Sequence, residues 1–390
     1  MIEQVHLGVA VVVVALAAAL IVGVVALRVR IPYSVALLLV AIPLKIAGSP
    51  ERFGPVLLFI YLPALVFEAA WNVELDALRR RWLSVAVLAV PGVAITAGAV
   101  ALALSVSKQL PLLPALLLGT ILAATDPVAV IAIFRRIPVP KDLAAIVEGE
   151  SLFNDGVTIV LYQLVLAALA TASAVPSASE IAGHALALAL GGAAVGFVAA
   201  LLVALVLRGI SDVLLILVGT VVAAYGGYLA ADAIGVSGIF AAVIAGLALR
   251  AFRHFPPIEG ADESIDFFWA AVAFFATSLV FLSMGLTIEF RRIVEEPVLV
   301  VSTLLALTAA RAVLAYGVLP LTGIRAEPPG WKHVVAISGM RGALSIALAL
   351  GLPASLAYRE QIVDAVFGVV FVTLVAQGLS IAPLLRRLRM

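Results

Sequence analysis

Residues 148–155 read EGESLFND, placing three carboxylates and one amide within eight positions of an otherwise apolar segment. Each ionised side chain would cost ~3 kcal/mol at the centre of a membrane helix. Such groups persist inside a membrane when they pair with one another, bind ions or carry protons. The stretch therefore predicts a functional site within a membrane-spanning helix.

The composition is that of an integral membrane protein. Of the 390 residues, 64% are hydrophobic and 12% are charged, with a mean hydropathy of +1.23. Soluble domains are nearer to about half apolar and a quarter charged. The net charge of +1 argues against nucleic-acid binding. The absence of cysteine excludes disulfides and thiol chemistry, and the four histidines lie too far apart in sequence to suggest a metal centre.

The apolar runs predict an all-α polytopic membrane protein with about 13 transmembrane helices. A span needs about 20 apolar residues, and glycine, proline and charged clusters mark the joints. The predicted spans are 5–27, 32–48, 54–71, 82–107, 111–134, 143–173, 179–207, 211–231, 236–251, 266–287, 297–320, 332–353 and 361–385.

Arginine and lysine in the connecting loops predict the orientation, because these residues concentrate on the cytoplasmic side. With the N-terminus outside and the C-terminus inside, sixteen of the 24 basic residues fall in inside loops and five in outside loops. We expect the inner (plasma) membrane of a prokaryote. The longest hydrophilic stretch is too short for a nucleotide-binding domain, so an ion gradient is the expected energy source.

Two predicted spans are interrupted near their middles. The fifth contains AATDPVAV, where Pro127 removes a backbone donor and disfavours helical geometry at Asp126. The twelfth contains ISGMRGALS, where Gly339 and Gly342 flank Arg341. Paired broken helices in two halves of a chain are typical of transporters built from inverted repeats, with the substrate at the breaks. Two ordinary kinks are the alternative.

The ionisable residues that lie well inside the spans indicate how the site is divided. These six residues are Glu68, Asp126, Glu150, Asp155, Arg311 and Arg341. At 100° per residue, Glu148, Ser151 and Asp155 share one helix face, while Glu150 and Asn154 share another. The first face offers hard oxygen ligands, the type that suits an alkali cation.

The remaining charged residues complete this prediction. The turn at Thr125–Asp126 would add a carboxylate and main-chain carbonyls, and Glu68 another oxygen. The alternatives are that Asp126 caps the half-helix after Pro127 and that Glu68 reaches water. Glu150 needs a permanent partner, for which Arg341 is the best candidate. We expect Arg311 to pair within the bundle or near the inner funnel.

The motifs resemble those of the NhaP branch of the cation–proton antiporters, relatives of the animal sodium–proton exchangers. The resemblance is carried by ATDPVAV followed by EGESLFNDG, and extends to LPALVFEAA and SGMRGALSIALAL. It covers essentially the whole chain. It implies an NhaA-like antiporter fold with inverted repeats and two crossing broken helices, spans 5 and 12. It also implies a homodimer and no enzymatic activity. We expect no counterpart of the long regulatory tail of the animal exchangers.

The resemblance also implies a division into domains. Interface-domain helices would occupy 1–74 (spans 1–3) and 211–287 (spans 8–10). Core-domain helices would occupy 82–173 (spans 4–6) and 297–390 (spans 11–13 and a short tail). A linking helix would span 179–207.

The resemblance assigns roles to the candidate site residues. Asp155 resembles the carboxylate that binds the ion and the proton. Its co-ligands would be Asp126, Thr125, Ser151 and Glu68. Asn154 matches the residue that accompanies electroneutral exchange. Glu150 and Arg341 resemble a structural ion pair, and Arg311 is a further structural or modulating candidate.

The implied function is secondary active exchange of a monovalent cation, Na⁺ foremost and Li⁺ also, for H⁺. The two ions would compete for Asp155, and the protein would exchange them 1:1 by alternating access. The expected partners are these ions and membrane lipid. No cofactor, nucleotide or nucleic acid is expected. The open alternatives are a K⁺/H⁺ antiporter, a sodium-coupled organic-solute symporter, a cation channel, and a membrane sensor or scaffold that transports nothing.

Overall fold

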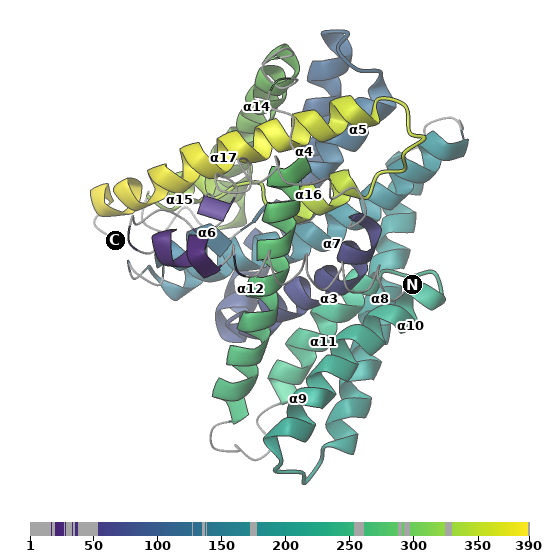
Figure 1. Cartoon of the computed structure of the whole chain (residues 1–390), viewed down its shortest axis with the longest axis vertical. Helices are drawn as coiled ribbons and strands as arrows, with labels where there is room; N and C mark the ends of the chain where they lie inside the picture. Colours follow the sequence, from purple (N-terminus) through teal and green to yellow (C-terminus); the bar gives the residue numbers. More distant parts are fainter. Residues whose placement is uncertain are drawn as a thin grey trace.

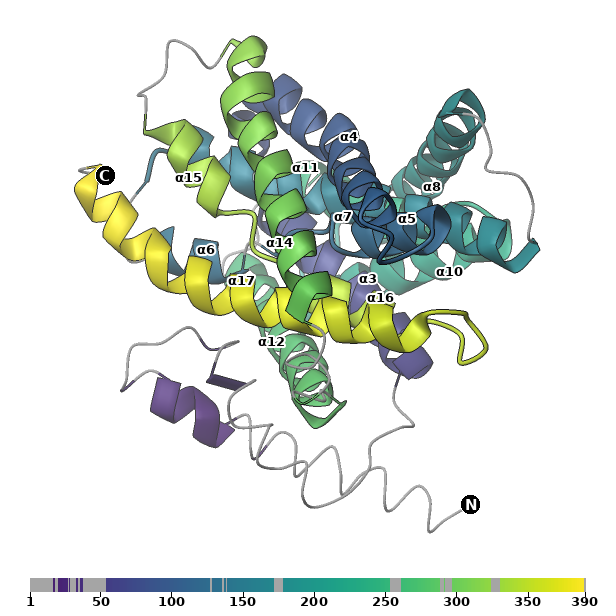
Figure 2. The ribbon, with the colours of Figure 1, turned by 90° about the horizontal axis from the view of Figure 1, so that it is seen from above.

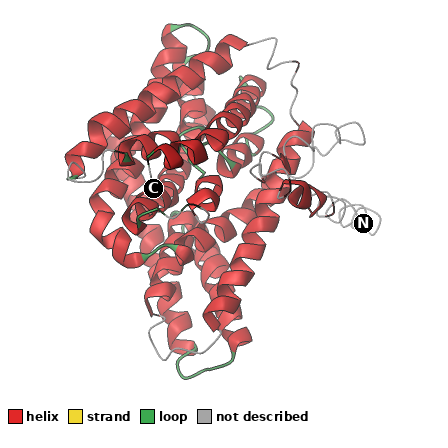
Figure 3. Ribbon diagram, turned by 90° about the vertical axis from the view of Figure 1, so that its left-hand side faces the viewer, coloured by secondary structure: helices red, strands yellow, loops and turns green. Residues whose placement is uncertain are grey.

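The computed structural model is helical throughout the residues that it describes, and Figure 3 shows helices and loops without strands among them. The described residues are 17, 20–26, 28, 33, 36, 37, 54–126, 128–134, 137, 139–171, 178–252, 261–287, 291, 297–323 and 330–388. The predicted spans 5–27 and 32–48 lie largely outside this set.

Every predicted span from 54–71 onward coincides with one or more described helices. The helices are α3 (Gly54–Asn72), α4 (Leu75–Val106), α5 (Leu112–Ile121), α6 (Val128–Phe134), α7 (Lys141–Thr171), α8 (Ala178–Val206), α9 (Val213–Val221), α10 (Gly227–Ala233), α11 (Gly238–Phe252), α12 (Ala261–Thr287), α14 (Pro297–Ala312), α15 (Trp331–Ile337), α16 (Ala343–Leu350) and α17 (Arg359–Arg387). The π-helix η2 (Val222–Gly226) joins α9 to α10, and the π-helix η3 (Val313–Val318) and the 3₁₀-helix η4 (Leu319–Thr322) extend α14.

Seven helical segments among the described residues are long and apolar enough to cross a membrane. Helices suit this environment because every backbone group inside a bilayer needs a partner within its own segment. α5 and α11 are shorter apolar helices. The predicted all-α membrane class is confirmed, whereas the count of 13 spans and the inverted repeats remain predictions.

The helices pack as two groups. α4–α7 pack with α14–α17, and Figure 2 shows the long helix α17 running past α6, α14, α15 and α16. α3 and α8–α12 form the second group, in which α11 contacts α3, α8 and α10. Figure 1 shows α4, α5, α14 and α17 toward the top of the molecule and α9 and α11 toward the bottom. Within the second group, α3 and α12 both contact α16, so they lie at the boundary with the first group.

Two pairs of short helices flank two breaks in the first group. α5 ends at Ile121 and α6 begins at Val128, while α15 ends at Ile337 and α16 begins at Ala343. The breaks meet, because Asp126 N donates to Met340 O at 2.8 Å. The first break lies where the sequence places Pro127, which is itself outside the described residues. The fold thus brings the two predicted interruptions together.

Candidate functional site

The break after α5 exposes main-chain carbonyls that side chains from other helices satisfy. Arg341 Nη1 donates to Ala123 O at 2.7 Å and to Ala124 O at 3.1 Å. Asn154 Nδ2 of α7 also donates to Ala123 O, at 2.9 Å. The last carbonyls of a helix lack amide partners and carry partial negative charge. A buried guanidinium therefore stabilises the C-terminal end of this half-helix.

Two serine hydroxyls bind further carbonyls of the same break. Ser345 Oγ of α16 donates to Ile121 O at 2.8 Å, and Ser151 Oγ of α7 donates to Thr125 O at 2.5 Å. A hydroxyl that donates one hydrogen bond still has two oxygen lone pairs, so Ser151 Oγ can also coordinate a cation. The carbonyls that the sequence offered as ion ligands thus already accept hydrogen bonds from the protein.

Asp126 lies at the N-terminus of the half-helix α16. Ala343 N, at the first position of α16, donates to Asp126 Oδ2 at 3.4 Å. A carboxylate is favourable there because the N-terminus carries partial positive charge. Gly342 permits this approach, since a Cβ at that position would overlap the Asp126 side chain. Asp126 therefore lies against the N-terminal end of α16.

Asp155 lies on α7 beside the crossing of the two breaks. Its Oδ1 atom is buried and has no hydrogen-bond partner among the described residues. Together with Asp126, Ser151, Thr125 and Glu68, Asp155 lines one cavity of about 1180 Å³. The predicted ligand residues thus share the wall of one cavity, and two of them are carboxylates of the crossing.

One face of α7 forms a wall of this cavity. Its residues recur at helical spacing, from Lys141 through Ala144, Glu148 and Ser151 to Asp155. Asp155 lies seven residues beyond Glu148, about 10 Å along the helix. At the far end, Lys141 Nζ lies 3.1 Å from Glu74 Oε1. The face of α7 predicted from the sequence therefore runs from this ion pair to Asp155.

Glu68 faces the same cavity from α3. Its Oε1 accepts a hydrogen bond of 2.8 Å from Asn72 Nδ2, one turn further along the helix. Asn72 also lines the cavity. The carboxylate is therefore oriented within α3, in the second helix group, while Asp126 and Asp155 belong to the first.

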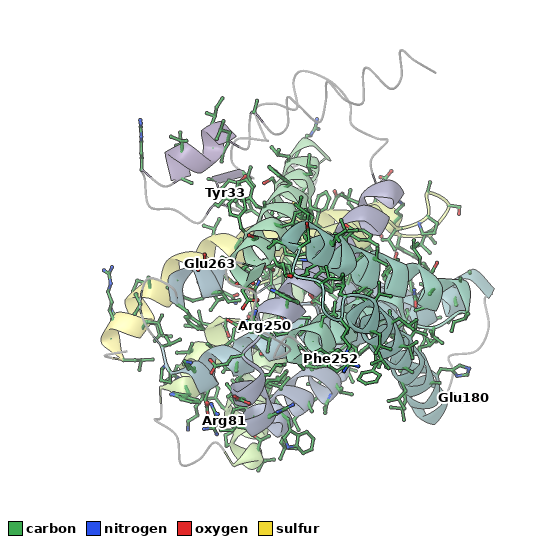
Figure 4. All side chains as sticks on the ribbon, turned by 90° about the horizontal axis from the view of Figure 1, so that it is seen from below. Tyr33, Arg81, Glu180, Arg250, Phe252 and Glu263 are labelled. Atoms are coloured by element: carbon green, nitrogen blue, oxygen red, sulfur yellow. The ribbon has the colours of Figure 1, made fainter. Side chains whose placement is uncertain are left out.

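Asp266 of α12 is a cavity residue that the sequence analysis did not single out. Its Oδ1 accepts a hydrogen bond of 2.6 Å from Trp71 Nε1 and lies 3.7 Å from Arg250 Nη1. Figure 4 shows Arg250 near the middle of the molecule seen from below, apart from Arg81. These contacts tie this part of the wall to α3 and α11, within the second helix group.

The predicted pairing of Glu150 with Arg341 is wrong. Arg311 of α14 donates to both carboxylate oxygens of Glu150, through Nη1 to Oε1 and through Nη2 to Oε2 at 3.0 Å. It also donates to Val335 O, from Nε at 3.0 Å and from Nη2 at 2.7 Å. Glu150 is 2% exposed and Arg311 7% exposed. Arg341 does not pair with Glu150, because it lies in the break between α15 and α16, where its guanidinium donates to the carbonyls of Ala123 and Ala124.

Asn154 is held in one orientation. Thr158 Oγ1 donates to Asn154 Oδ1 at 3.0 Å, so the amide NH₂ faces Ala123 O. Asn154 is 3% exposed and Thr158 fully buried. Asn154 therefore bridges α7 to the first break. Thr158 and Ser345 were not identified from the sequence. The available signals were the position of Thr158, four residues after Asn154, and that of Ser345, four residues after Arg341.

The donor set indicates which ligands the site could take. No group of three histidine, cysteine or carboxylate side chains is assembled as a metal centre within the described part of the chain. The crossing offers two carboxylates and hydroxyl oxygens, which are hard ligands for a small cation. A carboxylate can also take a proton. The geometry is thus compatible with alternating occupancy by a cation and a proton.

The chain is similar to known proteins along nearly its whole length. Residues 13–387 match the family model described as "Sodium/hydrogen exchanger, transmembrane". The Na⁺/H⁺ antiporter ApNhaP of Aphanothece halophytica is 35% identical over 372 residues, covering 92% of this chain and 70% of that protein. The Na⁺/H⁺ antiporter NhaP of Pseudomonas aeruginosa is 32% identical over 348 residues, covering 86% and 82%.

The fold is also found in a solved structure. The sodium proton antiporter MjNhaP1 from Methanocaldococcus jannaschii matches with a TM-score of 0.77 at 20% identity, covering 99% of each chain. This likeness shows the fold, and the family model and the relatives show the family. The resemblance found in the motifs is therefore confirmed: the chain belongs to the transmembrane sodium/hydrogen exchanger family, whose members are transporters rather than enzymes.

Proposed function

We propose that this protein is a secondary active antiporter that exchanges Na⁺ for H⁺, with Asp155 carrying either ion. The observation that carries the proposal is the buried Asp155 Oδ1, which has no hydrogen-bond partner among the described residues and belongs to a cavity-lining side chain. A buried carboxylate oxygen without a donor is costly unless a proton or a cation neutralises it. The relatives named above are Na⁺/H⁺ antiporters, which supports the same pair of ions here.

The other oxygen ligands come from the same cavity wall. Asp126, Ser151 and Thr125 would complete the coordination of Na⁺ or Li⁺ at the crossing. Glu68 would add an oxygen from α3. Because Asp126 and Asp155 belong to the first helix group, the ion would travel with that group while α3 stays behind.

The charge balance supports electroneutral 1:1 exchange. Glu150 and Arg311 neutralise one another, which leaves Asp126, Asp155 and Arg341 as the charged groups that the first helix group brings to the crossing, while Glu68 stays with α3. Ionised, these three carry one net negative charge, so a single Na⁺ or a single H⁺ makes the crossing neutral. A charged, empty crossing would meet the cost of placing charge in the membrane, while either loaded form avoids it. Only loaded forms would therefore cross readily, which couples the two ion flows.

We further propose that alternating access moves one helix group against the other. The core domain would comprise 82–173 and 297–390, and the interface domain 1–74 and 211–287, with 179–207 as the linking helix. A homodimer would form through the interface domain in the plasma membrane.

The cavity end with Lys141 would face the cytoplasm if the N-terminus is outside. Because the chain has no cysteine, single cysteines at Ser107 and Ser211 should label with impermeant reagents from outside and inside, respectively.

The deciding experiment uses proteoliposomes that enclose a pH-sensitive dye. Pulses of Na⁺ and Li⁺ should move protons in the wild type, and Asp155→Asn should abolish that movement while keeping the fold. Glu263→Gln is the matched control, because Glu263 is an exposed acid of α12 that does not line the cavity. Proton movement in response to K⁺ but not to Na⁺ or Li⁺ would favour a K⁺/H⁺ antiporter. Cation-driven solute uptake without proton movement would favour a symporter. Substantial Na⁺-dependent proton flux in Asp155→Asn would overturn the proposed mechanism.

A further inference from the structure

We propose that Arg341 sets the valence of the transported ion. Its charge would restrict the crossing to one monovalent cation and exclude divalent cations of the same size. The inference rests on the proposed function, since it concerns selectivity at the same crossing. It assigns to Arg341 a role beyond satisfying main-chain carbonyls.

The first step is that the charge of Arg341 is buried and has no ion-pair partner. The residue is 3% exposed. Its guanidinium donates to the carbonyls of Ala123 and Ala124, and among the described residues it forms no ion pair within 4.0 Å. A guanidinium stays protonated in proteins. Neutral carbonyls satisfy its hydrogen bonds, and no carboxylate among the described residues forms an ion pair with it.

The second step is the contrast with Arg311. Arg311 is also buried, but Glu150 accepts hydrogen bonds from two of its nitrogens. That pair contributes no net charge to its surroundings. Glu150, Arg311 and Arg341 are the charged residues that are buried in the described part of the chain. One unbalanced positive charge, that of Arg341, therefore remains beside the cavity.

The third step places this charge next to the ion ligands. The carbonyls that Arg341 holds immediately precede Thr125 and Asp126, which line the cavity with Asp155. Asp126 in turn binds the N-terminus of α16, two residues after Arg341. The two aspartates and Arg341, all on the first helix group, thus carry a net charge of −1, while Glu68 belongs to α3 and would stay behind when that group moves. A monovalent cation brings the moving group to zero, whereas a divalent cation would leave it with a positive charge.

Ca²⁺ is the probe that isolates this effect. Its ionic radius is close to that of Na⁺, and it accepts the same carboxylate, hydroxyl and carbonyl oxygens. Ionic size and ligand preference therefore do not distinguish Ca²⁺ from Na⁺ at this site. Their difference in charge is what the comparison tests. We expect Ca²⁺ to compete poorly with Na⁺ in the wild type.

Two substitutions separate the charge of Arg341 from its hydrogen bonds. Arg341→Lys keeps the charge and a donor, whereas Arg341→Gln keeps a donor and removes the charge. In Arg341→Gln the net charge becomes −2. The half-inhibitory Ca²⁺ concentration should then fall roughly tenfold or more, as expected for a unit charge about 10 Å away at an effective dielectric of about 20. Arg341→Lys should reject Ca²⁺ as the wild type does.

The experiment combines binding and transport on the full chain. Calorimetry of the purified protein measures Na⁺ binding and its competition by Ca²⁺, and dye-loaded proteoliposomes measure turnover. Arg341→Gln should retain Na⁺ binding but exchange slowly, because its singly loaded crossing keeps a negative charge. A purely structural defect would weaken binding and turnover together. Asn154→Asp, which adds one negative charge at the same crossing, is the second variant if Arg341→Gln does not fold.

The outcomes distinguish this inference from the proposed function. A wild type without Na⁺/H⁺ exchange would contradict the proposed function itself. A wild type that exchanges, together with a folded charge variant that rejects Ca²⁺ as strongly as the wild type, would overturn the valence role alone. Ca²⁺ competition in the charge variants but not in Arg341→Lys is the expected result.

Discussion

The two breaks meet at one crossing but contribute opposite chemistry. The first break, between α5 and α6, carries Asp126 and accepts hydrogen bonds through its carbonyls, including those from Arg341 and Ser151. The second break, between α15 and α16, carries Arg341 and presents the amide of Ala343 to Asp126. Each break supplies the charge that the other needs, because the C-terminus of a half-helix favours a cation and the N-terminus an anion.

This difference separates the residues that could bind the ion from the residues that hold them in place. The first break and α7 provide most of the candidate ligand oxygens of the cavity, whereas the second break provides the counter-charge and the close approach at Gly342. The second break is held in turn by Arg311, which binds Val335 in the last turns of α15. Apart from the charge of Arg341, changes on the support side should therefore act mainly on stability or geometry, and those on the ligand side on ion affinity.

The largest expected effect comes from removing the anchor of the second break. Glu150→Ala leaves Arg311 buried without its carboxylate, which should lower the free energy of unfolding by ~3–5 kcal/mol. Thermal unfolding in detergent measures this loss. Glu148→Ala, two residues away on the cavity face, is the control and should change stability little. An unchanged melting temperature with weakened Na⁺ binding would instead place Glu150 among the ion ligands.

The close contact between the breaks provides a second test. A methyl group in Gly342→Ala would overlap Asp126 and displace its carboxylate, and a displacement of about 1 Å can cost about 100-fold in rate. We expect a comparable loss of exchange in dye-loaded proteoliposomes. Gly98→Ala on α4 is the control, since no atom lies within 4 Å of a Cβ there. Normal exchange by Gly342→Ala would show that Asp126 can move without consequence.

The sequence predicted the local features of this crossing. The Asp126–Pro127 dipeptide indicated the first break, because proline disfavours helical geometry before it. The glycines around Arg341 indicated the second. The helical period placed Ser151 and Asp155 on one face of α7, and both line the cavity. These features depend on backbone chemistry within a single span, which a sequence expresses directly.

Contacts between spans could not be predicted in the same way. Both Arg311 and Arg341 are long cations in apolar spans, and spacing does not show which one reaches Glu150. The choice depends on the packing of α14 and α15 around α7. Ser345 was overlooked for a related reason: a single serine in an apolar helix gives no sign that its target, the carbonyl of Ile121, lies in another span.

A third prediction concerns the ligand side of the comparison. Ser151→Ala removes the donor to Thr125 O and a candidate oxygen ligand of the cavity. Losing one hydrogen bond should cost ~1 kcal/mol of stability, and losing a ligand should weaken Na⁺ binding roughly tenfold. Calorimetry with Na⁺ and thermal unfolding measure the two effects separately. Unchanged Na⁺ affinity would assign Ser151 to the support of the break alone.

The smallest effect should come from the matched serine on the support side. Ser345→Ala removes the donor to Ile121 O, at 2.8 Å, just as Ser151→Ala removes the donor to Thr125 O. The stability loss should again be ~1 kcal/mol, because one buried carbonyl loses its partner. Na⁺ affinity and exchange should stay at the wild-type level, since Ser345 lies on α16 and not on the face of α7 that carries Asp155. Ser345 also borders the cavity, so the same calorimetric titration tests the distinction directly. A fall in Na⁺ affinity as large as that of Ser151→Ala would make Ser345 a ligand, and the second break would then contribute to coordination as well as to charge.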